Sequence, residues 1–379
     1  MERSEPAGSG DSELIRRLLD LTPDTEPAPP REPAEPPGST LEPEGATLID
    51  DDWDERGSRV LLSQASAIAS RVGQERVTSV EPGLRHAARL ALFALAVVGA
   101  LAGLGVAWLH LTSDPLADAR AYYNAAVRLN LGQPLYPPGI DPGSNLAYLY
   151  PPLLAIVLRP LALLPYEWFA LLWEALVVAS FAALLWRLGV RSQRTWLAVG
   201  ILGIPIGWAL GVAQAQVPMT LLLSIGQPWS IALAANLKLF PVLAALWWIG
   251  RRDYQATIAF ILWLAILGLA QLLLEPAGTL DFLRTVGLGQ LGEVRNVSPY
   301  ALSPALWVTL VLAGIALALL LARTRWGWPA AVALATLASP RLLLYMFSGL
   351  LAALRQPSQA NLPEPVPRPW LMVSGGGRH

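Results

Sequence analysis

The sequence predicts an all-α protein, a polytopic bundle of transmembrane helices preceded by a disordered tail. Hydrophobic residues make up 54% of its 379 residues and charged residues only 15%. Several apolar runs approach or exceed the roughly 18–20 residues that cross a bilayer. A backbone in lipid must satisfy its own hydrogen bonds, so each run is expected to be a helix. The chain has no cysteine, which excludes a disulfide framework and a thiolate site.

The first part of the chain has a different composition. Residues 1–83 hold 18 acidic and 8 basic side chains and are rich in Pro, Glu, Gly and Ser. Such a segment cannot bury enough apolar surface to offset its ordering entropy. We therefore expect residues 1–85 to form a disordered, acidic cytoplasmic tail, within which 60–77 could form a helix that lies on the membrane or docks on a partner. Residues 356–379 are expected to form a flexible C-terminal tail.

Residues 86–355 are predicted to form the transmembrane domain, with about nine or ten spans. The apolar runs that predict them are 90–109, 168–186, 196–212, 229–249, 255–274 and 305–322, with shorter runs at 153–165, 216–225 and 328–354.

Basic residues predict the orientation of these spans. Arg85, His86 and Arg89 precede the first span, which places the tail in the cytoplasm and the following loop outside. Counting on, the arginines at positions 187, 191 and 194 fall outside, against the positive-inside tendency. They would move inside if the 149–165 segment did not cross the membrane. The first topology is the one we adopt from the sequence.

A polar loop of roughly forty residues follows the first span and carries the best candidates for chemistry. Asp118 lies just beyond the membrane edge, where it could act as a general base or simply cap the helix predicted over 121–129. Four tyrosines of the loop could line a sugar site or belong to an interfacial aromatic belt: Tyr122, Tyr123, Tyr136 and Tyr150. Asp114 is the reserve candidate for the base.

Two cations in apolar segments are the next candidates. Lys238, the only lysine, stands near the middle of the 229–249 run, three residues before Pro241. A charge there is costly unless it faces a polar cavity, so contact with a lipid phosphate is the functional interpretation and snorkelling to an interface the alternative. Arg341 follows Ser339-Pro340 in another apolar stretch, and its guanidinium could bind phosphate bidentately.

Several kinds of site have no support. No GxGxxG or Walker pattern occurs in a suitable context, the three histidines lack metal-ligand spacing, and the outer loops hold no DxD pair. There is no basic surface with interleaved aromatic residues for nucleic acid. We expect no metal, no other cofactor and no nucleic-acid partner.

The order of motifs resembles glycosyltransferase family 87, a family of polytopic GT-C enzymes. The resemblance rests on DARAYY (118–123), LGQPLY (131–136), YLYPPLLAIVLRPLALLP (148–165), AQAQVPMTLLL (213–223), LAANLKLFP (233–241), RNVSPYALSP (295–304) and LASPRLLLY (337–345). It covers about residues 88–355. Two departures are a shortened 216–241 stretch and Arg341, where relatives often place a histidine.

The resemblance implies an inverting hexose transfer, with mannose the expected sugar, from a polyprenyl-phosphate donor to a lipid or glycan acceptor. Asp118 would be the base, Lys238 a phosphate contact, and Gln216 and Asn296 further substrate-binding candidates. The site would face the extracytoplasmic side of the plasma membrane, in contact with membrane lipids. A transporter or lipid flippase would also use intramembrane charge and broken helices. A non-catalytic scaffold would fit the tail but would leave the loop motif unexplained.

Overall fold

The computed structural model describes residues 82–138, 144, 146–286, 296–355 and 357. Within these residues the secondary structure is helical and no strand occurs, so the all-α prediction is confirmed. The predictions for the C-terminal tail, and for all but the last few residues of the N-terminal tail, lie outside the described part. The described helices belong to one compact unit that begins at Val80.

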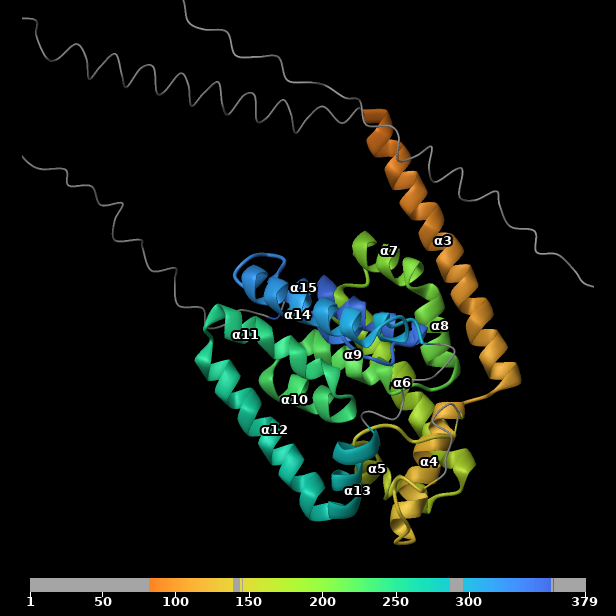
Figure 1. Ribbon diagram of the computed structural model, residues 1–379. Coiled ribbons are helices and arrows are strands. Elements are labelled where there is room, and N and C mark those ends of the chain that lie inside the picture. Colours follow the sequence, from red (N-terminus) through yellow and green to blue (C-terminus); the bar gives the residue numbers. More distant parts are fainter. Residues whose placement is uncertain (1–81, 139–143, 145, 287–295, 356, 358–379) are drawn as a thin grey trace, which may run out of the picture. The chain divides into compact units, whose positions relative to one another are not determined.

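Four helices are long and apolar enough to cross a membrane: α3 (Pro82–Ser113), α6 (Tyr166–Leu188), α12 (Tyr254–Leu274) and α14 (Pro304–Leu321). A fifth crossing is possible if α7 (Gln193–Ile201) and α8 (Gly203–Gly211), which meet at 70°, form one broken span. In Figure 1, α3 descends to α4 and α12 descends to α13, so both long helices end beside the loop helices.

The remaining apolar segments are short, which is why the described residues hold four or five candidate spans rather than nine or ten. A helix of ten residues is about 15 Å long, half the thickness of a hydrocarbon core. These segments are α9 (Gln216–Ile225), α10 (Pro228–Leu237), η2 (Phe240–Ala245) with α11 (Leu246–Arg251), α15 (Gly327–Leu337) and η5 (Leu344–Leu354).

Two predicted apolar runs are therefore each two short helices. The 229–249 run breaks at Lys238, whose extended backbone caps the C-terminus of α10. The 328–354 run breaks between Ala338 and Leu343. Pro241 follows the break in the first run, and Pro340 lies within the break in the second. Proline has no backbone N–H to donate, and its ring clashes with the preceding turn, so neither residue can continue the helix before it. Lys238 thus lies at a helix end rather than within a span.

The polar loop after α3 contains the helix predicted there, α4 (Ala117–Asn130). It is followed by the seven-residue α5 (Pro152–Leu158) and by η1 (Leu161–Leu163). Both pack against α4, so the 149–165 segment does not cross the bundle and the chain turns directly into α6. This overturns the topology adopted from the sequence, because Arg187, at the far end of α6, now lies on the side where α3 begins. The other loop segments are α13 (Pro276–Asp281), η3 (Phe282–Val286) and η4 (Pro299–Ala301).

Glycines bring α3 and the α7–α8 pair into backbone contact. A Cβ on Gly103 would lie 2.3 Å from the carbonyl oxygen of Gly203, and a Cβ on Gly207 would lie 2.0 Å from that of Gly103. Helices in lipid commonly associate through small residues that let their backbones approach closely. Lipid tails are as apolar as the side chains, so burying apolar side chains between helices gives little stabilisation there. The contact runs along both helices toward the turn that begins α4, and it therefore fixes where that turn lies.

Candidate active site

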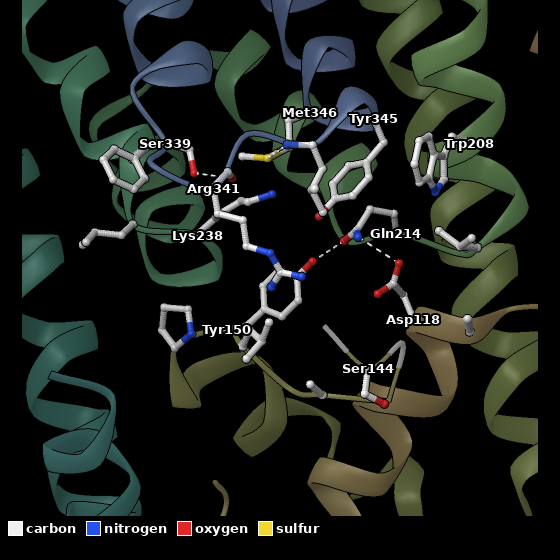
Figure 2. Close-up of a pocket in the computed structure, with 18 of the residues that line it drawn as sticks. Asp118, Ser144, Tyr150, Trp208, Gln214, Lys238, Ser339, Arg341, Tyr345 and Met346 are labelled. Atoms are coloured by element: carbon white, nitrogen blue, oxygen red, sulfur yellow. Dashed lines mark hydrogen bonds between the residues drawn. The ribbon is translucent and has the colours of Figure 1, made fainter. Parts of the chain in front are cut away.

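A cavity of about 190 Å³ opens where α3 ends, α4 begins and several short helices end. Figure 2 shows its lining side chains, with Asp118 facing Lys238 and Arg341 across it. The lining is His110, Asp114, Ala117, Asp118, Ser144, Ala147, Leu149, Tyr150, Pro151, Trp208, Val212, Gln214, Lys238, Leu239, Phe240, Phe282, Ser339, Pro340, Arg341, Leu343, Tyr345 and Met346.

Asp118 lies in the first turn of α4, where a carboxylate is favoured by the helix dipole. Leu116, which precedes this helix, adopts a left-handed backbone (φ 53°), and the Asp118 N–H donates to the Val212 carbonyl over 3.2 Å. The Asp118 side chain does not cap the helix. Its carboxylate oxygen Oδ2 instead accepts a hydrogen bond from Gln214 Nε2 at 2.9 Å. Asp118 is therefore a first-turn residue of α4 whose side chain bonds to Gln214 rather than to the helix backbone.

The surroundings of Asp118 bring the pKa of its carboxyl group close to neutral pH. Burial raises its pKa from 3.8 to about 7, and the charge of Asp114 adds to the increase. Lys238 and Arg341 act in the opposite direction, because positive charge favours the carboxylate. A carboxyl with a pKa near the working pH can both accept and release a proton, which is what a general base needs.

Lys238 projects its amine toward the same cavity. Its Nζ donates to Gln216 Oε1 at 3.2 Å and lies 5.0 Å from the centre of the Tyr345 ring. An ammonium close to an aromatic face is stabilised by the ring quadrupole, and more so where water is excluded. The amine thus lies among polar and aromatic groups, in the position that the functional interpretation required.

Arg341 enters the cavity from the segment between α15 and η5. Asn296 holds this segment, because its amide nitrogen donates to the Pro340 carbonyl (2.8 Å) and its oxygen accepts from the Leu342 N–H (2.9 Å). The backbone N–H of Val297 also donates to the Leu342 carbonyl at 2.9 Å. Asn296 therefore positions the backbone on both sides of Arg341.

Of the residues predicted from the sequence, five line the cavity, namely Asp118, the reserve candidate Asp114, Tyr150, Lys238 and Arg341, and five others do not. Tyr123 packs on Phe169 and donates to the Leu164 carbonyl, while Tyr136 donates to the Tyr150 carbonyl. The other three support residues that line it: Tyr122 contacts Gln214, Gln216 contacts Lys238, and Asn296 contacts the segment of Arg341.

Sequence reasoning missed several lining residues. His110 and Trp208 stack with ring centroids 5.2 Å apart, and Trp208 meets Tyr345 edge to face. Gln214 was passed over in favour of Gln216, although both stand in the same AQAQ motif. The sequence does show polar residues directly after an apolar run, which indicates a position near a polar site. This pattern does not distinguish which of the two glutamines faces the cavity.

Among the described residues, no group of three or more His, Asp or Glu side chains could hold a metal ion. Of the two carboxylates that line the cavity, Asp114 directly follows α3 and Asp118 lies in the first turn of α4. The two cations of the cavity come from the ends of α10 and α15. This arrangement suits a substrate with an anionic leaving group on one side and a hydroxyl that loses a proton on the other.

The chain is similar to proteins of one enzyme family. The model of glycosyltransferase family 87 matches residues 148–354. A polyprenol-phosphate-mannose-dependent alpha-(1-2)-phosphatidylinositol pentamannoside mannosyltransferase of Mycolicibacterium smegmatis is 28% identical over 289 residues, covering 68% of this chain and 70% of the relative. The enzyme of the same name from Mycobacterium tuberculosis is 25% identical over 286 residues, covering 68% and 62%. No solved structure matches the chain.

Proposed function

Because the chain belongs to glycosyltransferase family 87, we propose that it transfers a hexose from a polyprenyl-phosphate donor to a hydroxyl of a lipid or glycan acceptor. The names of its relatives favour mannose as the sugar and a glycolipid as the acceptor. The observation that carries the proposal is the placement of the Asp118 carboxyl opposite Lys238 and Arg341 in one cavity.

The cationic side of the cavity suits the leaving group. As the bond between the anomeric carbon and the phosphate oxygen breaks, the phosphate keeps the electron pair and gains negative charge. The Lys238 ammonium and the Arg341 guanidinium would stabilise that charge, and the guanidinium can bind two phosphate oxygens at once. Both residues line the cavity, so one phosphate could contact both.

The acidic side of the cavity suits the acceptor. Asp118 would remove the proton from the acceptor hydroxyl as its oxygen attacks the anomeric carbon from the face opposite the phosphate. The new glycosidic bond forms while the phosphate bond breaks, so the configuration at the anomeric carbon inverts. General-base assistance of this kind contributes roughly 10²–10⁴-fold to a rate.

Positive charge at the other end of the bundle favours an extracytoplasmic cavity. Arg187 donates to the carbonyls of Ser224 and Ile225, at the end of α9 away from the cavity. Arg251 donates to the Ala322 carbonyl, where α11 meets the end of α14. Further arginines flank the helix ends on this side, at positions 89, 191, 194, 252, 323, 325 and 355. Since such residues collect on the cytoplasmic side, the cavity would face outward, and we place the protein in the plasma membrane.

A transport function would use the same broken helices and recessed charges, so the test must detect a chemical change. The full-length protein is reconstituted in vesicles with a polyprenyl-phosphate hexose and a glycolipid acceptor. A product heavier by one hexose, with an anomeric configuration opposite to that of the donor, supports the proposal. Movement of the donor between leaflets without a new glycosidic bond would replace it with the transporter.

A further inference from the structure

Gln214 is a fully buried glutamine, 1% exposed, and its side chain hydrogen-bonds to Asp118 and to the hydroxyls of two tyrosines. Its Oε1 accepts hydrogen bonds from the hydroxyls of Tyr122, at 2.7 Å, and of Tyr150. Its Nε2 donates to Asp118 Oδ2 at 2.9 Å. One amide thus joins two tyrosines to the carboxyl that faces the cavity.

The tyrosines decide which way this amide points. The Tyr122 hydroxyl accepts a hydrogen bond from the Ala215 N–H at 3.2 Å and donates its own proton to Gln214 Oε1. A group that receives a hydroxyl proton must be the amide oxygen, which leaves the NH₂ to face Asp118. The amide therefore presents a donor to the carboxylate. In the reversed orientation its oxygen would face the carboxylate oxygen, and two acceptors would meet without a proton between them.

We propose that Gln214 is a positioning residue that holds Asp118 ionised and oriented for proton transfer, a role that rests on the proposed function. A hydrogen bond donated to a carboxylate favours the charged form over the neutral form. Because Oδ2 receives that bond, Oδ1 is the oxygen left to take the proton of the acceptor hydroxyl. Removing the amide would lower the fraction of ionised base and free the carboxyl to rotate.

The backbone around Gln214 supports this role. Ala213 adopts a left-handed conformation (φ 56°), which is unfavourable for a residue that has a Cβ atom. The Trp173 indole donates to the Ala213 carbonyl at 2.8 Å, and the Gln214 N–H donates to the Ala209 carbonyl at 2.8 Å. With Leu116 also left-handed before α4, both sides of the contact between Gln214 and Asp118 are held in uncommon turns.

The ionisation of Asp118 also depends on the other groups around it. From α3 and the following turn these are His110 and Asp114, and from the opposite side they are Lys238 and Arg341. The hydroxyls of Tyr122, Tyr150 and Tyr345 are the remaining titratable groups nearby. Gln214 differs from all of these because it is uncharged at every pH, so its loss changes hydrogen bonding without changing the net charge.

The test compares Gln214→Leu with the wild type in the pH profile of kcat/KM. Because hydrogen bonds to charged groups are stronger than neutral ones, we expect the acidic limb to move up by about one to two pH units, with KM for the donor nearly unchanged. Gln214→Glu, of the same shape, should move the limb further by adding a negative charge. Tyr122→Phe should move it less, because the amide is then held by one tyrosine only.

The matched control is Gln271→Leu, which removes another buried glutamine that bonds to Asn236 and to the Leu153 N–H away from the cavity. It should lower the melting temperature without moving the limb. The inference is overturned if Gln214→Leu and Gln214→Glu both fold and the acidic limb of their kcat/KM profiles stays at the wild-type pH. If the wild type transfers no hexose, the proposed function fails, but the role of Gln214 can still be tested. The infrared carboxyl band of Asp118 is identified as the band that is absent in Asp118→Asn. Its pH titration in the wild type and in Gln214→Leu shows whether Gln214 favours the ionised form of Asp118.

Discussion

The two sides of the cavity are held in different ways. On the acidic side, Asp118 and Gln214 meet through side-chain hydrogen bonds, backed by two left-handed turns and the contact between α3 and α8. On the cationic side, Lys238 and Arg341 are long side chains that come from helix ends. Lys238 donates to Gln216, and Asn296 holds the backbone on both sides of Arg341. The difference matches the proposed chemistry, because proton transfer needs a closely fixed geometry, whereas a phosphate has several oxygens that a long cationic side chain can bind.

The largest expected effect is on the acidic side. Asp118→Asn keeps the size of the side chain but removes its basicity, so kcat should fall by roughly 10²–10⁴-fold while substrate binding is largely kept. Steady-state transfer assays measure this, and Asp114→Asn is the matched control. If the control loses transfer and Asp118→Asn does not, the base is Asp114. If neither variant loses transfer in a working assay, the transferase proposal itself gives way to the transporter.

A change remote from the cavity should damage the acidic side alone. Gly103→Ala would place a Cβ 2.3 Å from the Gly203 carbonyl, so α3 must move and the turn before Asp118 with it. We expect kcat to fall about 10- to 100-fold, since a shift of an ångström in a reacting group can cost that much. Gly105→Ala, on the same helix with nothing within 4 Å, should behave as the wild type. Equal loss of donor binding in Gly103→Ala would show that the two sides are not independent.

On the cationic side the expected loss is one of binding. Lys238→Met keeps much of the packing and removes the charge, and hydrogen bonds to charged groups are worth about 1.5–3 kcal/mol. The Kd for the donor should therefore rise about 10- to 100-fold, as measured by titration of a polyprenyl-phosphate sugar against the reconstituted protein. Arg194→Met, which removes an exposed charge from the opposite end, is the control. Unchanged donor affinity would leave Lys238 with a structural role.

The pH dependence should follow the acidic side. Since the folded protein raises the pKa of Asp118 to about 7, kcat/KM should decline as the pH falls below that value, and this limb should vanish in Asp118→Asn. For stability the direction is reversed. The folded state binds the proton more tightly than the unfolded state, so this contribution is present at low pH and is lost between pH 3.8 and about 7. Asp118→Asn should thus melt no lower than the wild type at pH 8.

The smallest effect is expected from Asn296, which holds the backbone on both sides of Arg341. Asn296→Ala removes the bonds to Pro340 and Leu342, each worth about 1 kcal/mol, so KM for the donor should rise several-fold with kcat nearly kept. Asn130→Ala, which removes a half-buried amide bonded to Arg159 away from the cavity, is the comparison. A fall in kcat as large as that of Asp118→Asn would contradict a role limited to Arg341.

The long helices and α4 can be predicted from the amino-acid sequence, because hydropathy and helical periodicity are properties of a single segment. The sequence also identified Asp118 and Lys238, since a carboxylate beside a span and a lone lysine in an apolar run are costly wherever they occur. The resemblance to family 87 rests on short motifs and on their order along the chain. All these features depend only on residues that are close together in the sequence.

Tertiary structure decided the rest. Gln214 and Asp118 stand 96 positions apart, and their contact depends on left-handed turns at Ala213 and Leu116 that side-chain type does not reveal. Tyr122 and Tyr123 are neighbours on one helix, yet one supports the cavity and the other packs on Phe169. The short 149–165 segment reads as a span by composition, but it packs on α4. Apolar character alone does not distinguish burial in protein from exposure to lipid, so only the packing could settle which segments cross and which residues meet.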